Sequence, residues 1–562
     1  MDSFKLLKRR TTDLFNSLPQ SLPSIQSLHL GGTHHSHGYG HGPNHLTMKG
    51  TWEKISGLPP LPRSSHSLNV VGGTVYIFGG ESEDARKPVS NDMHAVTLPS
   101  SGAQADCYAI KAKAALGSKK PQPIPTVQIE GEPDPASSGL LDKGKAPATD
   151  AELEAPELGD VPAPRVGHAT AVIGHRIFLS GGRGGPDMSA LDEHGRVWVF
   201  DTRTNVWSYL DPSTPAAPTP QPGASAIPAP RSFHVAAATD KPRNFNAATA
   251  HHPKPSTRAE AWRDWALGDS EEVGIPQRPI VGNVAANATD ADAEGYGTFI
   301  IHGGCLSGTP ERASDVWAFD IHSHTWQRLP DAPGAPRGGA ALAIAHSRLY
   351  RFGGFNGTGE EGGQLDVLEL GVDSFDDEFS AGEVSIAARG GWQSLLQTPR
   401  EDVGYKEEDP TAAPLTEDET DPWPAPRSVA GFQAVSVGGG GRDYLVLMLG
   451  EREPSGAGHE SAGGFWDDVW AFQVPAHHGG VAAGGLANSV LSAVGRKSAE
   501  GRWARVEVGP YDDEDDESAE GPGARGWFAS ATMEDVGEGI VLWGGLDGGN
   551  RRLGDGWILR LG

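Results

Sequence analysis

Short apolar runs separated by glycine-rich and polar turns recur along this chain and predict β-strands. The clearest set lies between Pro164 and Leu210, where a Gly181-Gly182 pair and a polar turn at 201–205 separate the runs. The runs are Ala169 to Ile173, Arg176 to Leu179, Val197 to Phe200 and Trp207 to Leu210. They predict four short strands. A sheet of this size cannot bury both of its faces alone, so it needs copies of itself stacked alongside.

The rest of the chain supplies five further copies of this unit. Each copy begins where an arginine, in most cases preceded by proline, leads into an apolar strand: Arg63, Arg165, Arg231, Arg337, Arg427 and Arg525. A strand ending in two glycines follows in five copies, at Gly80, Gly182, Gly304, Gly354 and Gly545, and the fifth copy has Gly450 alone. A strand after a polar turn and a strand led by Trp complete the unit. The third strand is weaker in copies one and four, with the letters DMHAV and LDVLEL.

These markers resemble the kelch repeat, in which a strand ends in Gly-Gly and a spaced aromatic pair follows. The resemblance covers residues 50–562 apart from insertions. It implies an all-β fold in which each repeat forms one four-stranded blade of a β-propeller. Glycine permits a tight turn at the strand end, and aromatic residues such as Trp198 and Trp207 fill the space between neighbouring sheets.

We therefore predict a six-bladed kelch propeller over residues 50–562, closed by an N-terminal strand. The predicted blades cover about 63–111, 164–210, 230–329, 336–397, 426–508 and 524–562, the last together with 50–56. The sixth copy supplies three strands, and the run around Trp52 supplies the fourth. This arrangement would leave no edge of the ring unpaired.

Segments outside the repeats differ in composition. Residues 112–162, 211–229, 398–424 and 509–523 are rich in Pro, Ala, Gly or acidic residues, which predicts long disordered insertions. Arg258 to Leu267 predicts a short helix. The tail 1–49 carries a histidine-rich tract from His29 to His45, and we expect disorder there. Its first 18 residues alternatively form a basic amphipathic helix for a membrane surface or a partner groove.

The formal charge of −27 makes nucleic acid an unsuitable partner, because the field of the protein would repel phosphates. Only Cys107 and Cys305 are present, and no run of about 20 apolar residues could span a membrane. We expect a monomeric, cytoplasmic protein with an unidentified protein partner. Membrane contact is expected at most through the basic N-terminal segment.

The repeated arginines are the candidate binding site. Equivalent loops of a propeller emerge on one face, so Arg63, Arg165, Arg231, Arg337, Arg427 and Arg525 are expected to ring a mouth of the central channel, with His66, His168 and His234 three residues after the first three. Guanidinium groups there would bind carboxylate or phosphate. The alternative is that these arginines pair with nearby acids and are structural, because duplication repeats structural residues.

The resemblance implies a protein-interaction platform that binds its partner on a loop face around the channel. The alternative is a small-molecule enzyme of the nitrile-specifier or sugar epimerase type. Nitrile-specifier proteins hold iron through a Glu-x-x-x-Asp-x-x-x-His pattern; Glu311 and Asp315 begin one here, but Phe319 replaces the histidine. We favour the platform and assign no catalytic residue, metal ligand or cofactor.

Overall fold

A computed structural model describes residues 48–82, 87–98, 105–115, 158–213, 225–239, 297–307, 311–374, 384–397, 423–437, 442–456, 461–475, 501–510, 521–533 and 539–562. Leu46–Gly562 forms one compact unit, and Met1–His45, with its histidine tract, lies outside the described residues. The predicted helix at 258–267 and most of the predicted insertions also lie outside them. Every element within the described ranges is a β-strand. No described helix is long and apolar enough to cross a membrane.

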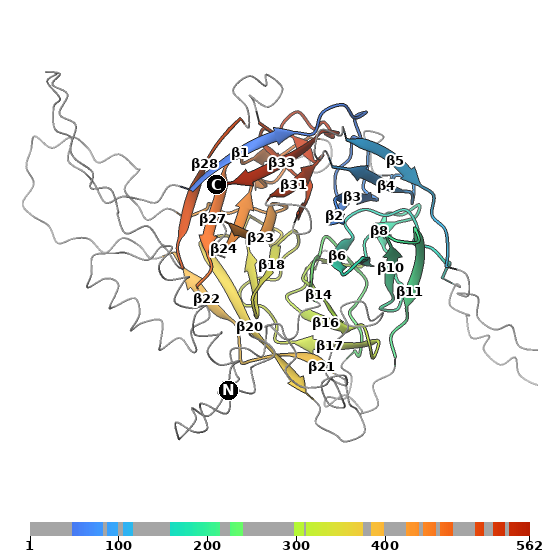
Figure 1. Cartoon of the computed structure of the whole chain (residues 1–562). Coiled ribbons are helices and arrows are strands. Elements are labelled where there is room, and N and C mark those ends of the chain that lie inside the picture. Colours follow the sequence, from blue (N-terminus) through green and yellow to red (C-terminus); the bar gives the residue numbers. More distant parts are fainter. Residues whose placement is uncertain are drawn as a thin grey trace, which may run out of the picture. The chain divides into compact units, whose positions relative to one another are not determined.

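The described strands pair into six sets of four, which we call blades 1 to 6 and which lie around a common centre (Figure 1). Blade 1 holds β2 (Ser67–Val71), β3 (Thr74–Phe78), β4 (Met93–Thr97) and β5 (Asp106–Ile110). Blade 2 holds β6 (Ala169–Ile173), β7 (Arg176–Ser180), β10 (Val197–Asp201) and β11 (Val206–Leu210). Blade 3 holds β13 (Val235–Thr239), β14 (Thr298–His302), β16 (Val316–Asp320) and β17 (Thr325–Leu329).

Blades 4 to 6 repeat the same order from the innermost to the outermost strand. Blade 4 holds β18 (Ala341–Ala345), β19 (Arg348–Phe352), β20 (Gln364–Ser374) and β22 (Gln393–Leu396). Blade 5 holds β23 (Gly431–Val437), β24 (Arg442–Met448), β27 (Val469–Gln473) and β28 (Trp503–Pro510). Blade 6 holds β30 (Ala529–Thr532), β31 (Ile540–Trp543), β33 (Gly556–Leu561) and, as its outer strand, β1 (Met48–Lys54). The fold is thus a β-propeller, as predicted.

Middle strands are buried on both faces because each sheet packs against a neighbouring sheet on either side. In β3, four of the five residues are buried, and β14 is buried throughout. Trp198 and Trp207, nine residues apart, are each 1% exposed and pack with Phe78 of blade 1 in one core cluster. The ring centroids of Phe78 and Trp207 lie 5.1 Å apart. The spaced aromatic pair therefore fills an interface between blades.

Backbone hydrogen bonds repeat at all six blade junctions and make the ring continuous. The second glycine of each pair, or Gly450 in blade 5, donates its N–H to the carbonyl of the repeated arginine in the next blade, over 2.9 to 3.0 Å. The donors are Gly80, Gly182, Gly304, Gly354, Gly450 and Gly545, and the acceptors are Arg165, Arg231, Arg337, Arg427, Arg525 and Arg63. We call the end of the ring that carries these contacts the Gly-Gly face.

A second hydrogen-bonded circle lies at the same end, closer to the axis. It joins the residue two positions after each repeated arginine to its counterpart in the preceding blade, over 2.6 to 3.3 Å: Ser65, Gly167, Phe233, Gly339, Val429 and Trp527. Their φ angles lie between 46° and 60°, in the left-handed region that favours glycine. We call these six residues the inner circle.

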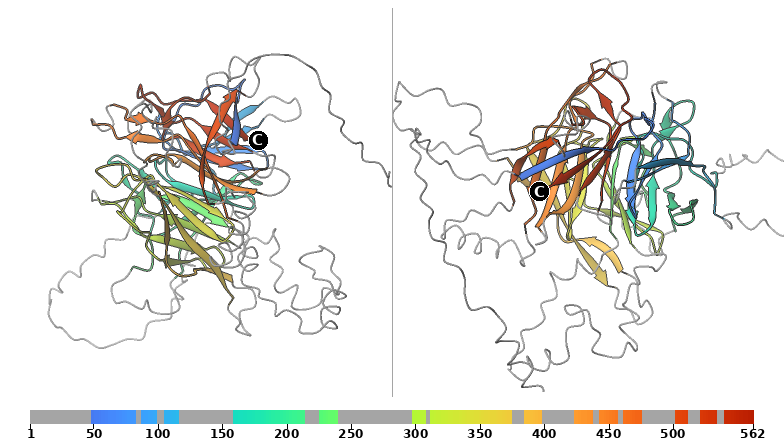
Figure 2. Two further views of the ribbon diagram at one scale, coloured as in Figure 1. Left: turned by 90° about the vertical axis from the view of Figure 1, so that its left-hand side faces the viewer. Right: turned by 45° about the horizontal axis from the view of Figure 1, so that its top comes forward.

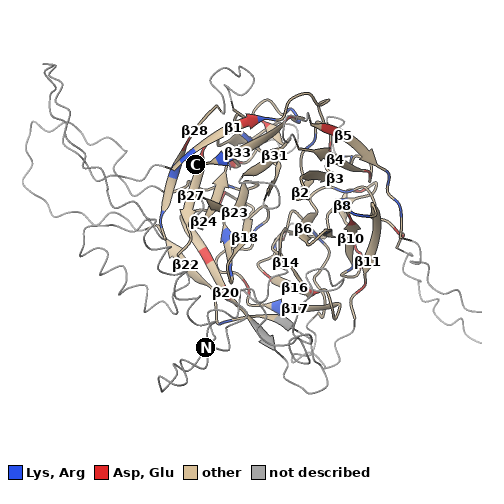
Figure 3. Ribbon diagram, viewed as in Figure 1, with Lys and Arg blue, Asp and Glu red and all other residues tan. Residues whose placement is uncertain are grey.

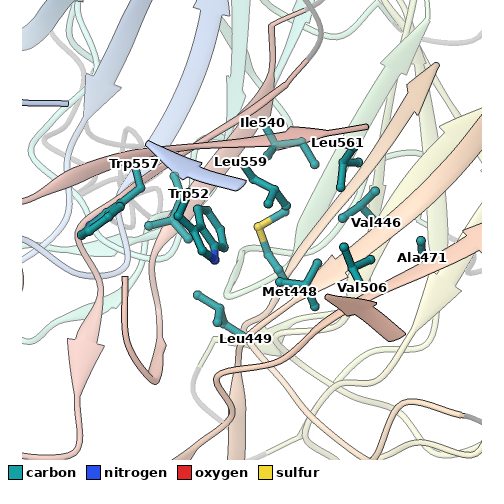
Figure 4. Packing of buried hydrophobic residues seen from close by; sticks show 12 residues of the cluster. Trp52, Val446, Met448, Leu449, Ala471, Val506, Ile540, Trp557, Leu559 and Leu561 are labelled. Atoms are coloured by element: carbon teal, nitrogen blue, oxygen red, sulfur yellow. The ribbon is translucent and has the colours of Figure 1, made fainter. Parts of the chain in front are cut away.

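Strand β1 closes the ring, as predicted from the sequence. It pairs antiparallel with β33, matching Trp52 to Leu559, and parallel with β28, matching Met48 to Val506. Blades 5 and 6 therefore form one continuous eight-stranded sheet. Figure 4 shows Trp52 among Met448, Leu449 and Trp557, in the core cluster that joins these blades. The strand begins at Met48, two residues before the predicted segment.

Blade 4 carries an addition that sequence patterns do not indicate. Strand β20 continues past the blade, and its second half pairs with β21 (Val384–Ala388). The resulting hairpin projects from the ring (Figures 1 and 2). Short strand pairs decorate the Gly-Gly face: β8 (Arg183–Gly184) with β9 (Ser189–Ala190), β12 (Arg231–Ser232) with β15 (Cys305–Leu306), β25 (Glu451–Glu453) with β26 (Gly464–Phe465), and β29 (Arg525–Gly526) with β32 (Leu546–Asp547).

Candidate functional site

The six repeated arginines lie on the Gly-Gly face, but their side chains are buried. Each residue is at most 4% exposed. Each guanidinium donates from Nη1 to the carbonyl at the first glycine position of its own blade, over 2.9 to 3.2 Å: Gly79, Gly181, Gly303, Gly353, Leu449 and Gly544. The arginine side chain thus bonds to its own blade, and the arginine carbonyl accepts from the glycine of the preceding blade. This geometry fits the structural alternative, and partner binding at the arginines stays a prediction.

Four of these arginines form two-point ion pairs with a carboxylate of their own blade. The pairs are Arg165 with Glu193, Arg231 with Asp315, Arg427 with Asp468 and Arg525 with Asp555, over 2.6 to 3.0 Å. A Trp indole N–H donates to the same carboxylate in each case, from Trp198, Trp317, Trp470 and Trp557, over 2.6 to 2.8 Å. The acidic residue is therefore held by two donors of one blade.

Blades 1 and 4 depart from this scheme, and these are the blades with the weaker third strand in the sequence. Arg337 of blade 4 has the Glu361 carboxylate at 3.4 Å, beyond the distances of the other pairs. Among the described residues, Arg63 of blade 1 has no carboxylate partner within 4.0 Å. Burial lowers the pKa of each guanidinium to about 10. Asp366 of blade 4 stands at the position of the Trp and pairs with Arg351 instead.

The three predicted histidines pack between blades and also line the central cavity, and partner binding at them stays a prediction. His66, His168 and His234 are each 6% exposed. A Cβ on Gly79 would lie 2.7 Å from the His168 ring, and a Cβ on Gly181 would lie 2.7 Å from the His234 ring. Burial, with the positive charge of the neighbouring arginine, lowers the pKa of His66 and of His234 to about 3. These imidazoles are therefore neutral at pH 7 and do not form a cationic ring.

A central cavity of about 780 Å³ runs between the innermost strands of the blades. Its lining is mostly small, with many alanines such as Ala171, Ala237 and Ala343. At the Gly-Gly face, the rings of Phe233 and Trp527, both members of the inner circle, meet edge to face with their centroids 5.4 Å apart. Because these two residues come from blades 3 and 6, the aromatic pair narrows the cavity at that end.

A set of varied side chains surrounds the inner circle on the Gly-Gly face, and we call it the collar. It consists of the residue after each glycine position, namely Glu81, Arg183, Cys305, Phe355, Glu451 and Leu546, and the residue that each of these bridges, namely Pro88, Ala190, Arg312, Glu360, Phe465 and Arg552. The backbone contacts repeat in all six blades, whereas the side chains differ. Duplication explains the repeated contacts and leaves the choice of collar side chains unexplained.

Six collar residues are ionisable Arg or Glu, and several of them reach the neighbouring blade. Arg552 donates to Glu81 over 2.9 Å, from blade 6 to blade 1. Arg183 donates to Ser232 over 2.8 Å, with its guanidinium carbon 4.6 Å from the ring centroid of Phe233. Few charged positions lie on the strands themselves, as the mostly tan ribbon of Figure 3 shows.

Two collar acids, Glu360 and Glu451, hold their protons to unusually high pH. Burial raises the pKa of Glu360 to about 8, and the charge of Glu451 adds to this rise. Neither carboxylate oxygen of Glu360 has a hydrogen-bond partner among the described residues. Burial also raises the pKa of Glu451 to about 7, against a side-chain hydrogen bond from Trp527. Carboxyl groups that titrate near neutral pH can donate or accept protons in catalysis.

The incomplete iron pattern has a different role in the structure. Asp315, its central carboxylate, accepts hydrogen bonds from Arg231 and Trp317. Burial raises the pKa of Asp315, but these hydrogen bonds and the Arg231 charge outweigh it, so the pKa is lowered. Asp315 therefore belongs to the repeated ion pairs. The described residues hold no group of three or more His, Cys, Asp or Glu side chains that could bind a metal.

A match to a family model agrees with the fold. The family model described as the kelch motif matches residues 164–213. The chain is 24% identical over 391 residues to N-(sulfonatooxy)prop-2-enimidothioate sulfolyase of Thlaspi arvense, which covers 69% of this chain and 90% of that protein. It is 27% identical over 230 residues to the Rab9 effector protein with kelch motifs of Rattus norvegicus, covering 39% of this chain and 56% of that relative. A solved chain titled "Structure of YjhT" is 12% identical with a TM-score of 0.42, covering 88% of this chain and 94% of that one.

Proposed function

Because this chain is a kelch-repeat protein, we propose that it is a cytoplasmic protein-interaction platform whose partner binds the collar on the Gly-Gly face. The observation that carries the proposal is the contrast between repeated and varied positions. The repeated arginines, the glycines and the inner-circle residues all make contacts that hold the blades together. The collar residues occupy equivalent backbone positions but differ from blade to blade, as expected of a surface shaped for one asymmetric partner.

The collar also has the physical character of a protein-binding surface. Arginine and aromatic side chains are enriched at binding hot spots, and the collar combines Arg183, Arg312 and Arg552 with Phe355. The Arg312 guanidinium carbon lies 4.9 Å from the ring centroid of Phe355. The rat relative is named an effector protein, which is a role carried out by binding another protein.

Partner capture from a cell extract tests the proposal with the double variant Arg183→Ala and Arg312→Ala. The control is Arg328→Ala, on the outer strand of blade 3. The side chain of Arg328 is 54% exposed, and its ion pair is with Asp331, which is also exposed. We expect the collar variant, while still folded, to lose specific partners that the wild type and the control retain. Retention of every partner by the collar variant would contradict the proposal.

A small-molecule enzyme is the second candidate, and two observations favour it. The relative from Thlaspi arvense, named a sulfolyase, aligns over 69% of this chain. In addition, Glu360 and Glu451 titrate near neutral pH in the collar. The test is to incubate the purified chain with N-(sulfonatooxy)prop-2-enimidothioate and to measure sulfate. Release that exceeds the uncatalysed rate and falls in Glu360→Gln would support the enzyme, and release at the uncatalysed rate would exclude this activity.

A further inference from the structure

The repeated ion pairs reveal an acceptor position that blade 1 fills differently from the other blades. In blades 3, 5 and 6 the residue just before the third strand is Asp315, Asp468 or Asp555. Each accepts two hydrogen bonds from the repeated arginine and one from a Trp two residues later. The strand registers align Asp92 with these aspartates and His94 with the tryptophans.

Blade 1 keeps the arginine, has His94 at the Trp position, and pairs its aspartate with a different residue. Asp92 pairs with Lys111 over 2.6 Å, and not with Arg63. Arg63 is 4% exposed and donates to the Gly79 carbonyl over 3.1 Å, while its Nε has no hydrogen-bond partner among the described residues. In blades 2 to 5 this Nε donates to the carbonyl two residues earlier. In blade 1 the corresponding Leu61 carbonyl accepts from Trp543 instead, over 3.4 Å.

His94 stands at the register position that the indole occupies in blades 3, 5 and 6. Burial and then the charge of Arg63 lower the pKa of His94 to about 4, against the opposing charge of Asp92. At pH 7 the ring is therefore neutral and carries one N–H. An imidazole is also smaller than an indole, so His94 itself occupies less volume than the Trp of blades 3, 5 and 6.

We propose that Arg63 and His94 form a binding site for a carboxylate that comes from outside blade 1. A buried guanidinium without a counter-charge is unfavourable, and a carboxylate accepting from Arg63 and His94 would complete the arrangement that four other blades already contain. The matching carboxylate side chains in blades 2, 3, 5 and 6 are 9% to 27% exposed, so the equivalent position in those four blades is partly accessible from solvent. Blade 4 differs because Glu361 already lies 3.4 Å from Arg337.

Thermal unfolding of the full chain in acetate tests the site, with chloride at equal ionic strength as the reference. At an acetate concentration ten times its Kd, we expect the wild-type Tm to rise by about 2 °C. Arg63→Met should abolish the rise, and His94→Phe should reduce it. Arg328→Met is the matched control, since Arg328 is exposed and should contribute only non-specific binding. If Arg63→Met does not fold, Arg63→Lys should fold and weaken acetate binding about tenfold, because an ammonium cannot bind two carboxylate oxygens side by side.

Equal wild-type Tm values in acetate and chloride would overturn the proposal, as would an acetate response that survives Arg63→Met. Glu83 and Asp84 are carboxylates in the sequence between β3 and β4 of blade 1, and they lie outside the described residues. A double Glu83→Gln and Asp84→Asn variant therefore tests whether the chain supplies the carboxylate itself. A response seen only in that variant would show that the chain itself supplies the carboxylate, which also overturns the proposal.

Two probes distinguish the sources of the carboxylate. The peptide acetyl-Gly-Gly-Glu-Gly-Gly-amide represents an acidic side chain of a partner, and its Gln analogue is the control. A Tm rise with the Glu peptide supports a protein partner, and a rise with acetate alone supports a free small acid. The site does not depend on the collar: loss of partners in the collar variant with an intact acetate response would separate the two ideas.

Discussion

Asp468 and Asp92 occupy equivalent positions in blades 5 and 1, yet their removal should have very different costs. Asp468 accepts from Arg427 over 2.6 and 3.0 Å and from Trp470 over 2.7 Å, and its side chain is 9% exposed. Asp92 instead pairs with Lys111, whose side chain is 84% exposed. We therefore compare Asp468→Ala with Asp92→Ala.

The expected loss in free energy of unfolding depends on whether a substitution leaves a buried charge without its partner. Asp468→Ala leaves the guanidinium of Arg427, which is 1% exposed, buried without a counter-charge, and removing one partner of a buried pair costs about 3–5 kcal/mol. Asp92→Ala removes an ion pair with an exposed lysine, which contributes about 1 kcal/mol or less. Removing both charges, in Arg427→Met with Asp468→Leu, should be less costly than Asp468→Ala alone, because no unpaired charge stays buried.

Urea unfolding followed by Trp fluorescence measures these differences in free energy. Far-UV circular dichroism of each variant at zero urea confirms that it is folded before titration. Equal losses for Asp468→Ala and Asp92→Ala would refute the reasoning, because the two sites would then be energetically alike. A double variant no more stable than Asp468→Ala would show that the lost hydrogen bonds of Arg427 to backbone, and not its charge, dominate.

Three further predictions concern the ring. Deleting 48–54 should lower the Tm of the whole propeller in a scanning calorimeter, because β28 and β33 lose the strand between them; an unchanged cooperative transition would contradict the closure. Gly182→Ala should lower the free energy of unfolding in urea by about 2–4 kcal/mol, since φ of Gly182 is 100° and the new Cβ would lie 2.9 Å from His168. Gly185→Ala should lower it by only about 1 kcal/mol, because φ of Gly185 is 70° but nothing lies within 4 Å of the new Cβ. Glu360 and Glu451 have raised folded pKa values, so the stability that they contribute is complete below pH about 4.5 and is lost as pH rises through about 7 to 8; Gln at both positions should flatten the pH dependence of Tm in that window.

The fold was predictable because the residues that build it repeat. The arginine and the glycine pair mark each blade, and a propeller needs the same contact at every junction. The closing strand around Trp52 was predictable from strand counting, since the sixth copy lacks an outer strand. The hairpin of β20 and β21 was not, because residues 371–389 carry no repeat marker and their pairing depends only on β20 continuing beyond the blade.

The candidate site was less predictable, because the position of a residue in the repeat does not tell which other residue its side chain contacts. Glu193 and Asp315, which occupy the two acid positions of blades 2 and 3, lie 28 and 84 residues after their arginines. The collar follows the glycines directly, but only the bridges between strands show that Glu81 and Pro88 face each other. One signal was present in the sequence: an ionisable residue directly after the glycines, as at Glu81 and Arg183.

The place of β1 in the ring also sets the timing of folding during synthesis. Glu53 of β1 pairs with Arg560 of β33, 507 residues later, over 2.9 Å. At about 5–20 residues per second, the first strand waits roughly 25–100 s for its partners. Throughout that interval the emerging chain is an open arc with an unpaired strand at its beginning. The last strand of blade 6 to be synthesised is therefore the one that turns the arc into a ring.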